Sequence, residues 1–134
     1  MFEAFCKDKL GPLTLRLALG LVAGYHGYLK IMAAGGTAWN PGWHVGWQVL
    51  LAWAEFVAGV AILFGFRCRI AAGVLVLVTS VVLAWGRGRR ILEMPLQNLE
   101  LVFLLLLAAL ALLCFGAGEV SIDARGRKKP ARKA

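Results

Sequence analysis

Residues 46–65 read GWQVLLAWAEFVAGVAILFG, an apolar run of 20 residues that contains one charged side chain, Glu55. A helix needs about 20 residues to cross a hydrocarbon core of roughly 30 Å. Because the bilayer core offers no water to the peptide groups, a single apolar segment satisfies its backbone there by forming a helix. The run therefore predicts a transmembrane helix.

Three further apolar stretches have a similar length, and clear breaks separate them. Gly35 and Gly36 end one stretch, Arg67 and Arg69 mark a tight polar turn, and Pro95 suits the first turn of a helix. The expected spans are residues 12–34, 46–65, 68–86 and 95–116. The sequence thus predicts an all-α membrane protein whose single domain, residues 1–124, is an antiparallel bundle of four transmembrane helices. Residues 125–134 are expected to form a disordered basic tail.

The composition excludes the main alternatives to a membrane protein. The 134 residues are 60% apolar and 16% charged, whereas a soluble domain is roughly 45–50% apolar and about 25% charged. A soluble fold of this size leaves much of its surface exposed and could not hide so many apolar side chains. Disorder requires low hydrophobicity, which this chain lacks.

The distribution of positive charge predicts the orientation. In a four-span protein, Lys7, Lys9, Arg67, Arg69 and the six basic residues of the tail share one side, while Arg87, Arg89 and Arg90 lie on the other, with Lys30 near its surface. Because cytoplasmic loops are rich in Lys and Arg, both termini are expected in the cytoplasm, at the plasma membrane. The expected aromatic anchors at the outer interface are Trp39, Trp43, Trp47 and Trp85.

The basic tail follows directly on an apolar stretch, which favours a membrane surface over nucleic acid as its partner. Each basic residue near anionic lipid gains about 1 kcal/mol. We therefore expect the lipid bilayer, with anionic lipids at the tail, and no nucleic acid.

Five polar residues fall within the expected spans, where a charge costs a few kcal/mol unless it has a partner or a function. Four of them fall in the outer half of the bundle when depth is counted at 1.5 Å per residue. The five are Arg16, which lies nearer the inner side, and His26, Lys30, Glu55 and Glu100.

Two interpretations of these residues stay open. In the structural one, Lys30 pairs with Glu55 or Glu100, and Arg16 pairs with Glu119 or Asp123 at the inner surface. In the functional one, a polar pocket open to the outer side handles protons, a quinone head group or another small polar ligand.

The candidate pocket residues are His26, Lys30, Glu55 and Glu100. His26 favours this second interpretation, because histidine can change charge near neutral pH. A metal site is not expected, since no His, Cys and carboxylate cluster has ligand spacing.

Small residues mark one face of the first expected span. Gly20 and Gly24 fit the small-xxx-small pattern that lets two membrane helices approach closely. Gly27 falls on the same stripe as Arg16 and Lys30, at 100° per residue. We expect these three glycines to pack against another helix.

Several short motifs, in this order, resemble the DoxX family of small four-helix membrane proteins. They are LRLALGL at 15–21 with YHGYLK at 25–30, AEFVAG at 54–59 with LFG at 63–65, QNLE at 97–100, and FGAGEVSIDA at 115–124. Together they cover about residues 12–124. Ala117 stands where the family often has proline, and the basic segment 86–90 and the long basic tail are departures from the pattern.

The resemblance implies a role in membrane redox chemistry, since relatives include the membrane subunit of a thiosulfate:quinone oxidoreductase. The favoured hypothesis is an accessory or anchor subunit of an electron-transfer complex, itself non-catalytic, whose partners are other membrane or soluble subunits. One alternative is a stand-alone quinone reductase, and another is a small transport or proton-relay protein. No firmly bound cofactor is expected, although a quinone could bind.

Overall fold

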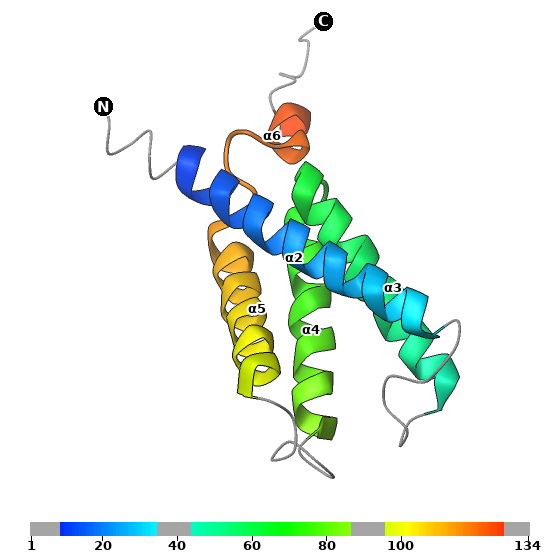
Figure 1. The fold of residues 1–134 in the computed structure, drawn as a ribbon. Coiled ribbons are helices and arrows are strands. Elements are labelled where there is room, and N and C mark those ends of the chain that lie inside the picture. Colours follow the sequence, from blue (N-terminus) through cyan, green and yellow to red (C-terminus); the bar gives the residue numbers. More distant parts are fainter. Residues whose placement is uncertain (1–8, 35–43, 87–95, 128–134) are drawn as a thin grey trace, which may run out of the picture.

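The computed structural model describes residues 9–34, 44–86 and 96–127, and that part of the chain is helical, without a strand. Its helices are α2 (Gly11–Ala34), α3 (Val45–Phe64), α4 (Cys68–Gly86), α5 (Leu96–Phe115) and the short α6 (Ile122–Arg127) (Figure 1). The all-α prediction is confirmed. The four long helices begin and end within one residue of the predicted apolar stretches.

The long helices alternate in direction, and α2 runs obliquely across the others (Figure 1). The most extensive contact joins α2 to α3, and smaller contacts join α3 to α4, α4 to α5 and α2 to α5. The core between them is made of small and aliphatic side chains, which include Leu19, Ala23, Ile62, Leu75, Ala109 and Leu112.

The contact between α2 and α3 depends on three glycines. A Cβ on Gly20 would come within 2.9 Å of the Gly59 carbonyl oxygen, and one on Gly27 would lie 2.7 Å from the Cα of Phe56. A Cβ on Gly59 would in turn meet the backbone of Gly24. Real Cβ atoms do not approach backbone this closely, so the absence of side chains is what lets the two helices touch. We call this contact the glycine seam.

The three glycines of the first span contribute to this contact in different ways: a Cβ on Gly20 or Gly27 would collide with the α3 backbone, whereas one on Gly24 would not. A Cβ on Gly24 would meet nothing within 4 Å. Gly24 contributes its backbone, on which Gly59 of α3 rests, rather than an absent side chain. On α2 the seam therefore requires a glycine at Gly20 and again seven residues later, at Gly27, rather than four residues later, at Gly24.

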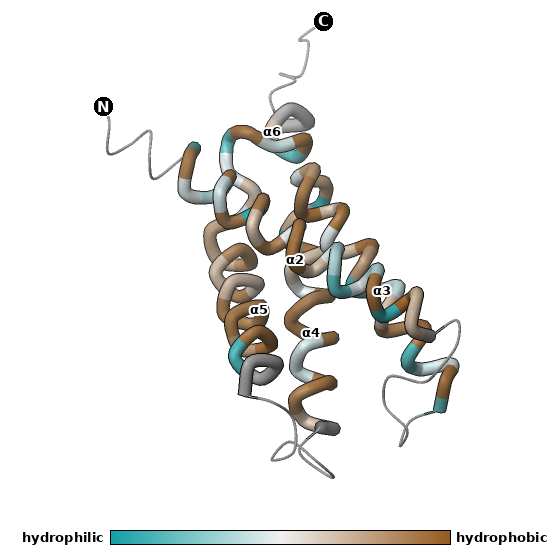
Figure 2. Tube along the Cα trace, in the orientation of Figure 1, coloured by the Kyte–Doolittle hydropathy of each residue, from teal (hydrophilic) through white to brown (hydrophobic). Residues whose placement is uncertain are grey.

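Many apolar side chains lie on the outside of the bundle. Figure 2 shows brown stretches in each long helix, interrupted by white and teal ones. Leu21, Val57, Leu77 and Leu104, one from each long helix, are all exposed. Within the described ranges, α3 is the one helix both long and apolar enough to cross a membrane by length and composition. The apolar parts of α4 and α5 are shorter, at Cys68–Ala84 and Glu100–Phe115.

The C-terminal segment differs from its prediction. The expected disordered tail begins at residue 125, but residues 125–127 belong to α6, which starts at Ile122. Ser121 explains the early start, because its hydroxyl accepts the Ala124 N–H at 3.1 Å and so caps the helix. Residues 128–134 lie outside the described part of the chain.

The glycine seam predicts opposite effects for two neighbouring substitutions. Gly27→Ala should destabilise the protein by about 1–3 kcal/mol, because the new methyl group overlaps the α3 backbone. Gly24→Ala should be neutral or stabilise by up to about 1 kcal/mol, since its methyl group enters open space and alanine favours the helix. Thermal unfolding of both variants in the same detergent compares them, and equal midpoints would refute the seam.

Candidate functional site

Arg16 of α2 is buried, with 3% of its surface exposed, and it joins three segments of the chain. Its Nε and Nη2 donate to the carbonyls of Ile62 and Leu63, each at 3.2 Å. Its Nη1 donates to the carbonyl of Ala117 at 3.0 Å and to that of Val120. We call Arg16, the 62–65 end of α3 and the 117–121 loop the arginine junction.

The end of α3 explains why a cation belongs there. The last carbonyls of a helix lack intrahelical partners and carry partial negative charge, so a nearby cation is stabilising. Gly65 ends α3 with φ of 69°, a left-handed conformation that glycine adopts without strain. A Cβ on Gly65 would lie 2.8 Å from the Arg16 guanidinium carbon, so this position also leaves room for the arginine.

Beside the C-terminal end of α3, Asp123 binds the N-terminal end of α4. Its carboxylate accepts the backbone N–H groups of Arg67 at 2.8 Å and Cys68 at 2.9 Å, at the start of α4. Its own N–H donates to the Gly65 carbonyl at 3.1 Å. Asp123 therefore caps α4 from more than 50 residues away and fixes the turn between α3 and α4.

These contacts correct the predicted ion pairs of Arg16 with Glu119 or Asp123. Arg16 bonds to backbone carbonyls, Asp123 bonds to backbone N–H groups, and Glu119 lies 3.6 Å from Lys9. The physical reason is that both helix ends expose unsatisfied backbone groups, which a buried arginine and an aspartate satisfy directly.

A second polar site joins α2 to α3. It lies just past Gly27, at the end of the glycine seam farther from Arg16. The Lys30 ammonium donates to Glu55 Oε2 in a close ion pair, one of the two pairings that the sequence predicts. The Glu55 side chain is 3% exposed and that of Lys30 is 26% exposed. The acid is thus held inside the bundle while the lysine reaches it from the edge.

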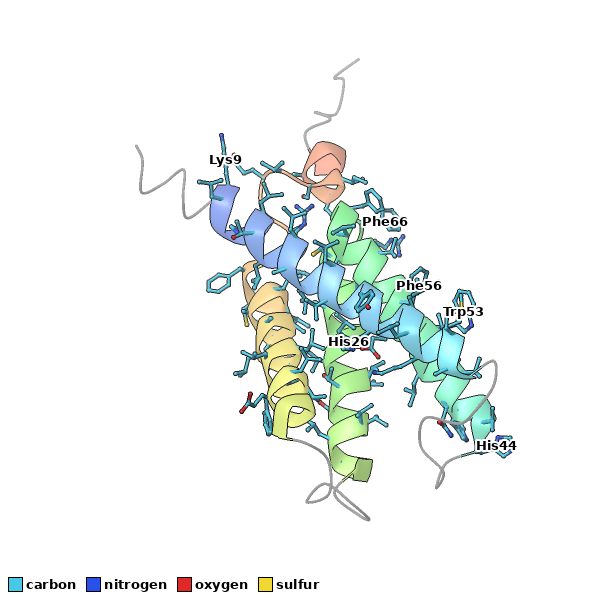
Figure 3. All side chains as sticks on the ribbon, in the orientation of Figure 1. Lys9, His26, His44, Trp53, Phe56 and Phe66 are labelled. Atoms are coloured by element: carbon cyan, nitrogen blue, oxygen red, sulfur yellow. The ribbon has the colours of Figure 1, made fainter. Side chains whose placement is uncertain are left out.

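The other two candidate pocket residues lie differently. His26, one turn before Lys30 on α2, is half-buried, and its ring meets the edge of Tyr25 with centroids 6.0 Å apart. Figure 3 places His26 midway along α2, well away from His44 at the start of α3. Glu100 is exposed near the start of α5, which Figure 1 shows apart from the end of α2 that carries Lys30.

Of the four candidate pocket residues, the structure brings Lys30 and Glu55 together, with His26 one turn away on α2 and Glu100 apart from them. The reason that Glu100 does not join them is geometric. Because α2 crosses the bundle obliquely, its C-terminal end leans over α3 and away from α5. The sequence places Glu100 and Lys30 in the same half of the bundle, but it does not show how far apart they lie across the bundle.

Of the predicted aromatic anchors, the structure places one. Trp47 lies in the first turn of α3 and is 65% exposed. Trp39, Trp43 and the side chain of Trp85 lie outside the described residues. Among the residues that the structure does describe, no group of three or more His, Cys, Asp or Glu could hold a metal ion.

The arginine junction predicts that lysine cannot replace Arg16. Arg16→Lys should lower stability by about 2–4 kcal/mol, because one ammonium cannot reach carbonyls on two sides and hydrogen bonds to charged groups contribute about 1.5–3 kcal/mol each. Arg67→Lys, at an exposed arginine, is the matched control and should change stability by less than about 0.5 kcal/mol. Thermal unfolding measures both, and equal midpoints would contradict the role given to Arg16.

One of three comparisons with known proteins found a match. The DoxX family matches residues 11–88, more than half of the chain. The matched region contains α2, α3 and α4, and with them Arg16, the glycine seam and the Lys30–Glu55 pair. A search of curated proteins and a search of solved structures each found no match.

The DoxX match starts at the first residue of α2 and ends just past α4, so it takes in these three helices and not the 117–121 loop of the arginine junction. The chain therefore belongs to the DoxX family of small membrane proteins.

Proposed function

We propose that all four long helices cross the plasma membrane and that the protein is an integral membrane subunit of an electron-transfer complex. The helices have 24, 20, 19 and 20 residues, and about 20 residues suffice to span the bilayer. Each also exposes large aliphatic side chains, which suit lipid better than water.

The observation that carries this proposal is that the charges of α2 are compensated within the bundle. Arg16 and Lys30 are the residues that argue most strongly against α2 as a membrane helix. Arg16 is satisfied by four carbonyls, and Lys30 by Glu55. With its cations engaged, α2 can enter the bilayer at a much lower cost.

The proposed orientation has both termini in the cytoplasm. The start of α2, the turn between α3 and α4, and α6 lie at one end of the bundle (Figure 1). That end carries Lys9, Arg67 and Arg69, and the basic tail follows α6. Positive residues favour the cytoplasmic side, where anionic lipids would attract the tail.

Labelling of one introduced cysteine tests this orientation. Cys68 is fully buried, so Phe66, exposed in the turn between α3 and α4, is the better reporter position. In a background with Cys6 and Cys114 replaced by serine, Phe66→Cys should react with an impermeant maleimide in opened cells but not in intact ones. Labelling in intact cells would reverse the orientation.

The burial of Glu55 and its ion pair with Lys30 favour a subunit role over an independent enzyme. A general acid or base must reach a substrate, whereas this carboxylate is buried and bonded to Lys30. The most deeply placed acid of the bundle thus joins two helices. The protein would then supply a membrane anchor and a surface for partner subunits, while the partners carry out the electron transfer.

A quinone could still bind at the edge of the same site. His26 is half-buried and one helical turn from Lys30. Among the described residues it has a ring contact with Tyr25 and no hydrogen-bond partner. A quinone carbonyl could accept a hydrogen bond from this imidazole, with loose binding that leaves the ion pair in place.

One purification tests the subunit role and the quinone separately. The tagged protein, extracted in mild detergent at its natural expression level, should retain stoichiometric redox subunits that mass spectrometry identifies. An organic extract of the same preparation should contain quinone, and a His26→Phe preparation should contain less. Recovery as a free monomer or homo-oligomer would refute the subunit role, while subunits without quinone would refute the quinone site alone.

A further inference from the structure

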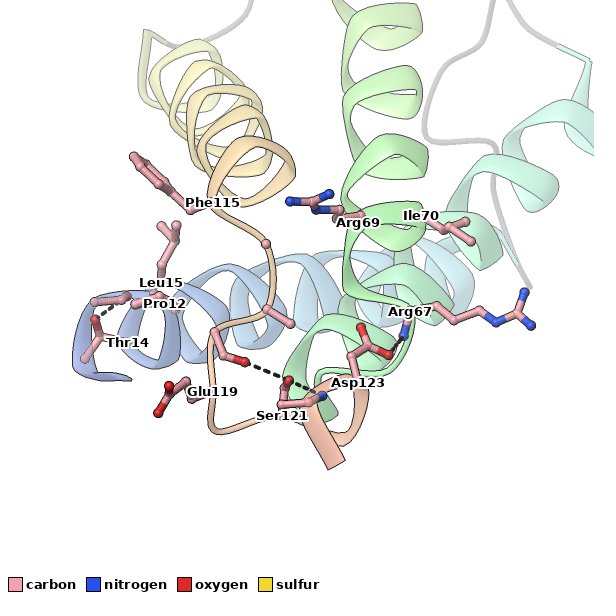
Figure 4. Close-up of a pocket in the computed structure, with 16 residues that line it drawn as sticks. Pro12, Thr14, Leu15, Arg67, Arg69, Ile70, Phe115, Glu119, Ser121 and Asp123 are labelled. Carbon is pink, nitrogen blue, oxygen red and sulfur yellow. Dashed lines mark hydrogen bonds between the residues drawn. The ribbon is translucent and has the colours of Figure 1, made fainter. Parts of the chain in front are cut away.

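A groove opens at the end of the bundle that carries the arginine junction. It lies between the first turns of α2, the start of α4 and the segment that joins α5 to α6 (Figure 4), with a volume of about 1410 Å³. Its lining combines aliphatic and aromatic side chains with two arginines, and includes Pro12, Leu15, Ile70, Phe115, Arg67 and Arg69. This mixed lining suits a ligand that is itself part apolar and part charged.

The apolar side of the groove comes from three helices. Leu15 belongs to α2, Ile70 to α4 and Phe115 to the end of α5. Phe115 is 74% exposed, and Ile70 is also exposed. Exposed apolar groups beside a groove gain from contact with a hydrocarbon chain.

The two arginines of the groove have side chains without a partner in the part of the chain that the structure describes. Among the described residues, the guanidinium groups of Arg67 and Arg69 make no hydrogen bond or ion pair. Figure 4 shows Arg69 extending from α4 toward the end of α5. Its Nε lies 3.3 Å from where a Cβ of Gly116 would be, so a glycine at this position keeps space beside the guanidinium.

The acidic residues of the groove, in contrast, are engaged. Glu119 is paired with Lys9 at 3.6 Å. Both oxygens of Asp123 accept backbone N–H groups at the start of α4. The four charged side chains of the lining carry no net charge together. Two further cations stand beside the groove, Lys9 at Glu119 and Arg16 at the Ala117 carbonyl, so this end of the bundle is positive and attracts an anion.

We propose that this groove binds one anionic phospholipid, with its phosphate on Arg69 and an acyl chain along Leu15 and Phe115. The planar guanidinium fork matches two phosphate oxygens. The groove is at the end of the proposed membrane helices, the depth at which lipid headgroups lie. A phospholipid carries both a phosphate for the arginine and a hydrocarbon chain for the apolar wall. The inference rests on the proposed membrane crossing and is independent of the redox role.

Spin-labelled lipids test the proposal with the full chain reconstituted in phosphatidylcholine vesicles. Electron paramagnetic resonance measures the fraction of labelled phosphatidylglycerol, or of labelled phosphatidylcholine, that the protein immobilises. The measurement is made in about 0.5 M salt, which screens the charges of the basic tail. The wild type should bind phosphatidylglycerol several-fold more strongly than phosphatidylcholine. Arg69→Gln should lower phosphatidylglycerol binding about fivefold and leave phosphatidylcholine unchanged.

Two further variants make the result specific. Phe115→Ala, on the exposed apolar wall, should also weaken phosphatidylglycerol binding. Joint replacement of Lys128, Lys129, Arg132 and Lys133 by glutamine should change it less than twofold. Equal binding of the two lipids by the wild type, or an Arg69→Gln variant that binds like the wild type, would overturn the proposal. Displacement of the lipid by millimolar inorganic phosphate would assign the site to a soluble anion instead.

The same spectra separate failure of the groove from failure of the membrane assignment. If the helices do not enter the bilayer, neither labelled lipid shows an immobilised fraction. If they enter but the groove is not a lipid site, both lipids show the same immobilised fraction.

Discussion

The compensation of the two cations of α2 by α3 is the interaction on which the rest of the structure depends. A charged side chain inside hydrocarbon is costly, so the proposal that α2 crosses the bilayer requires partners for both Arg16 and Lys30. The helix α3 provides them with different chemistry at two places, offering its last carbonyls to Arg16 and, from its middle, the Glu55 carboxylate to Lys30. The helix pair is thereby held at two points.

The glycine seam lies between these two points and makes them possible. Because Gly20, Gly27 and Gly59 lack side chains, the backbones come close enough for Lys30 to reach Glu55 and for Arg16 to reach the end of α3. Beside the arginine junction, Asp123 fixes the turn into α4 through its bonds to Gly65, Arg67 and Cys68. The close packing of α2 on α3 and the positions of the charged groups therefore depend on each other. The side chains of Arg67 and Arg69 take no part in these contacts and lie at the same end of the bundle.

The sequence predicts the elements well and the partners only in part. Helix bounds follow from apolar runs and from breaks such as the polar turn at Arg67 and Arg69. The pairing of Lys30 with Glu55 is one of two that the sequence predicts, since Glu55 and Glu100 both fall in the outer half of the bundle with the opposite charge. The contacts of Arg16 and Asp123 could not be foreseen in this way, because a backbone carbonyl or N–H has no signature in the sequence. Glu100 shows the same limit, since depth is readable from the sequence but the oblique crossing of α2 is not.

A double-mutant cycle on Lys30 and Glu55 tests the central claim most directly. The unfolding free energies of the wild type, Lys30→Met, Glu55→Gln and the double variant would be measured in one detergent. Charge compensation predicts that each single variant loses stability, and that the coupling energy is about 1–3 kcal/mol. It also predicts that the double variant is more stable than Lys30→Met, which leaves a buried carboxylate unpaired. Strictly additive effects, with a coupling energy near zero, would contradict the account.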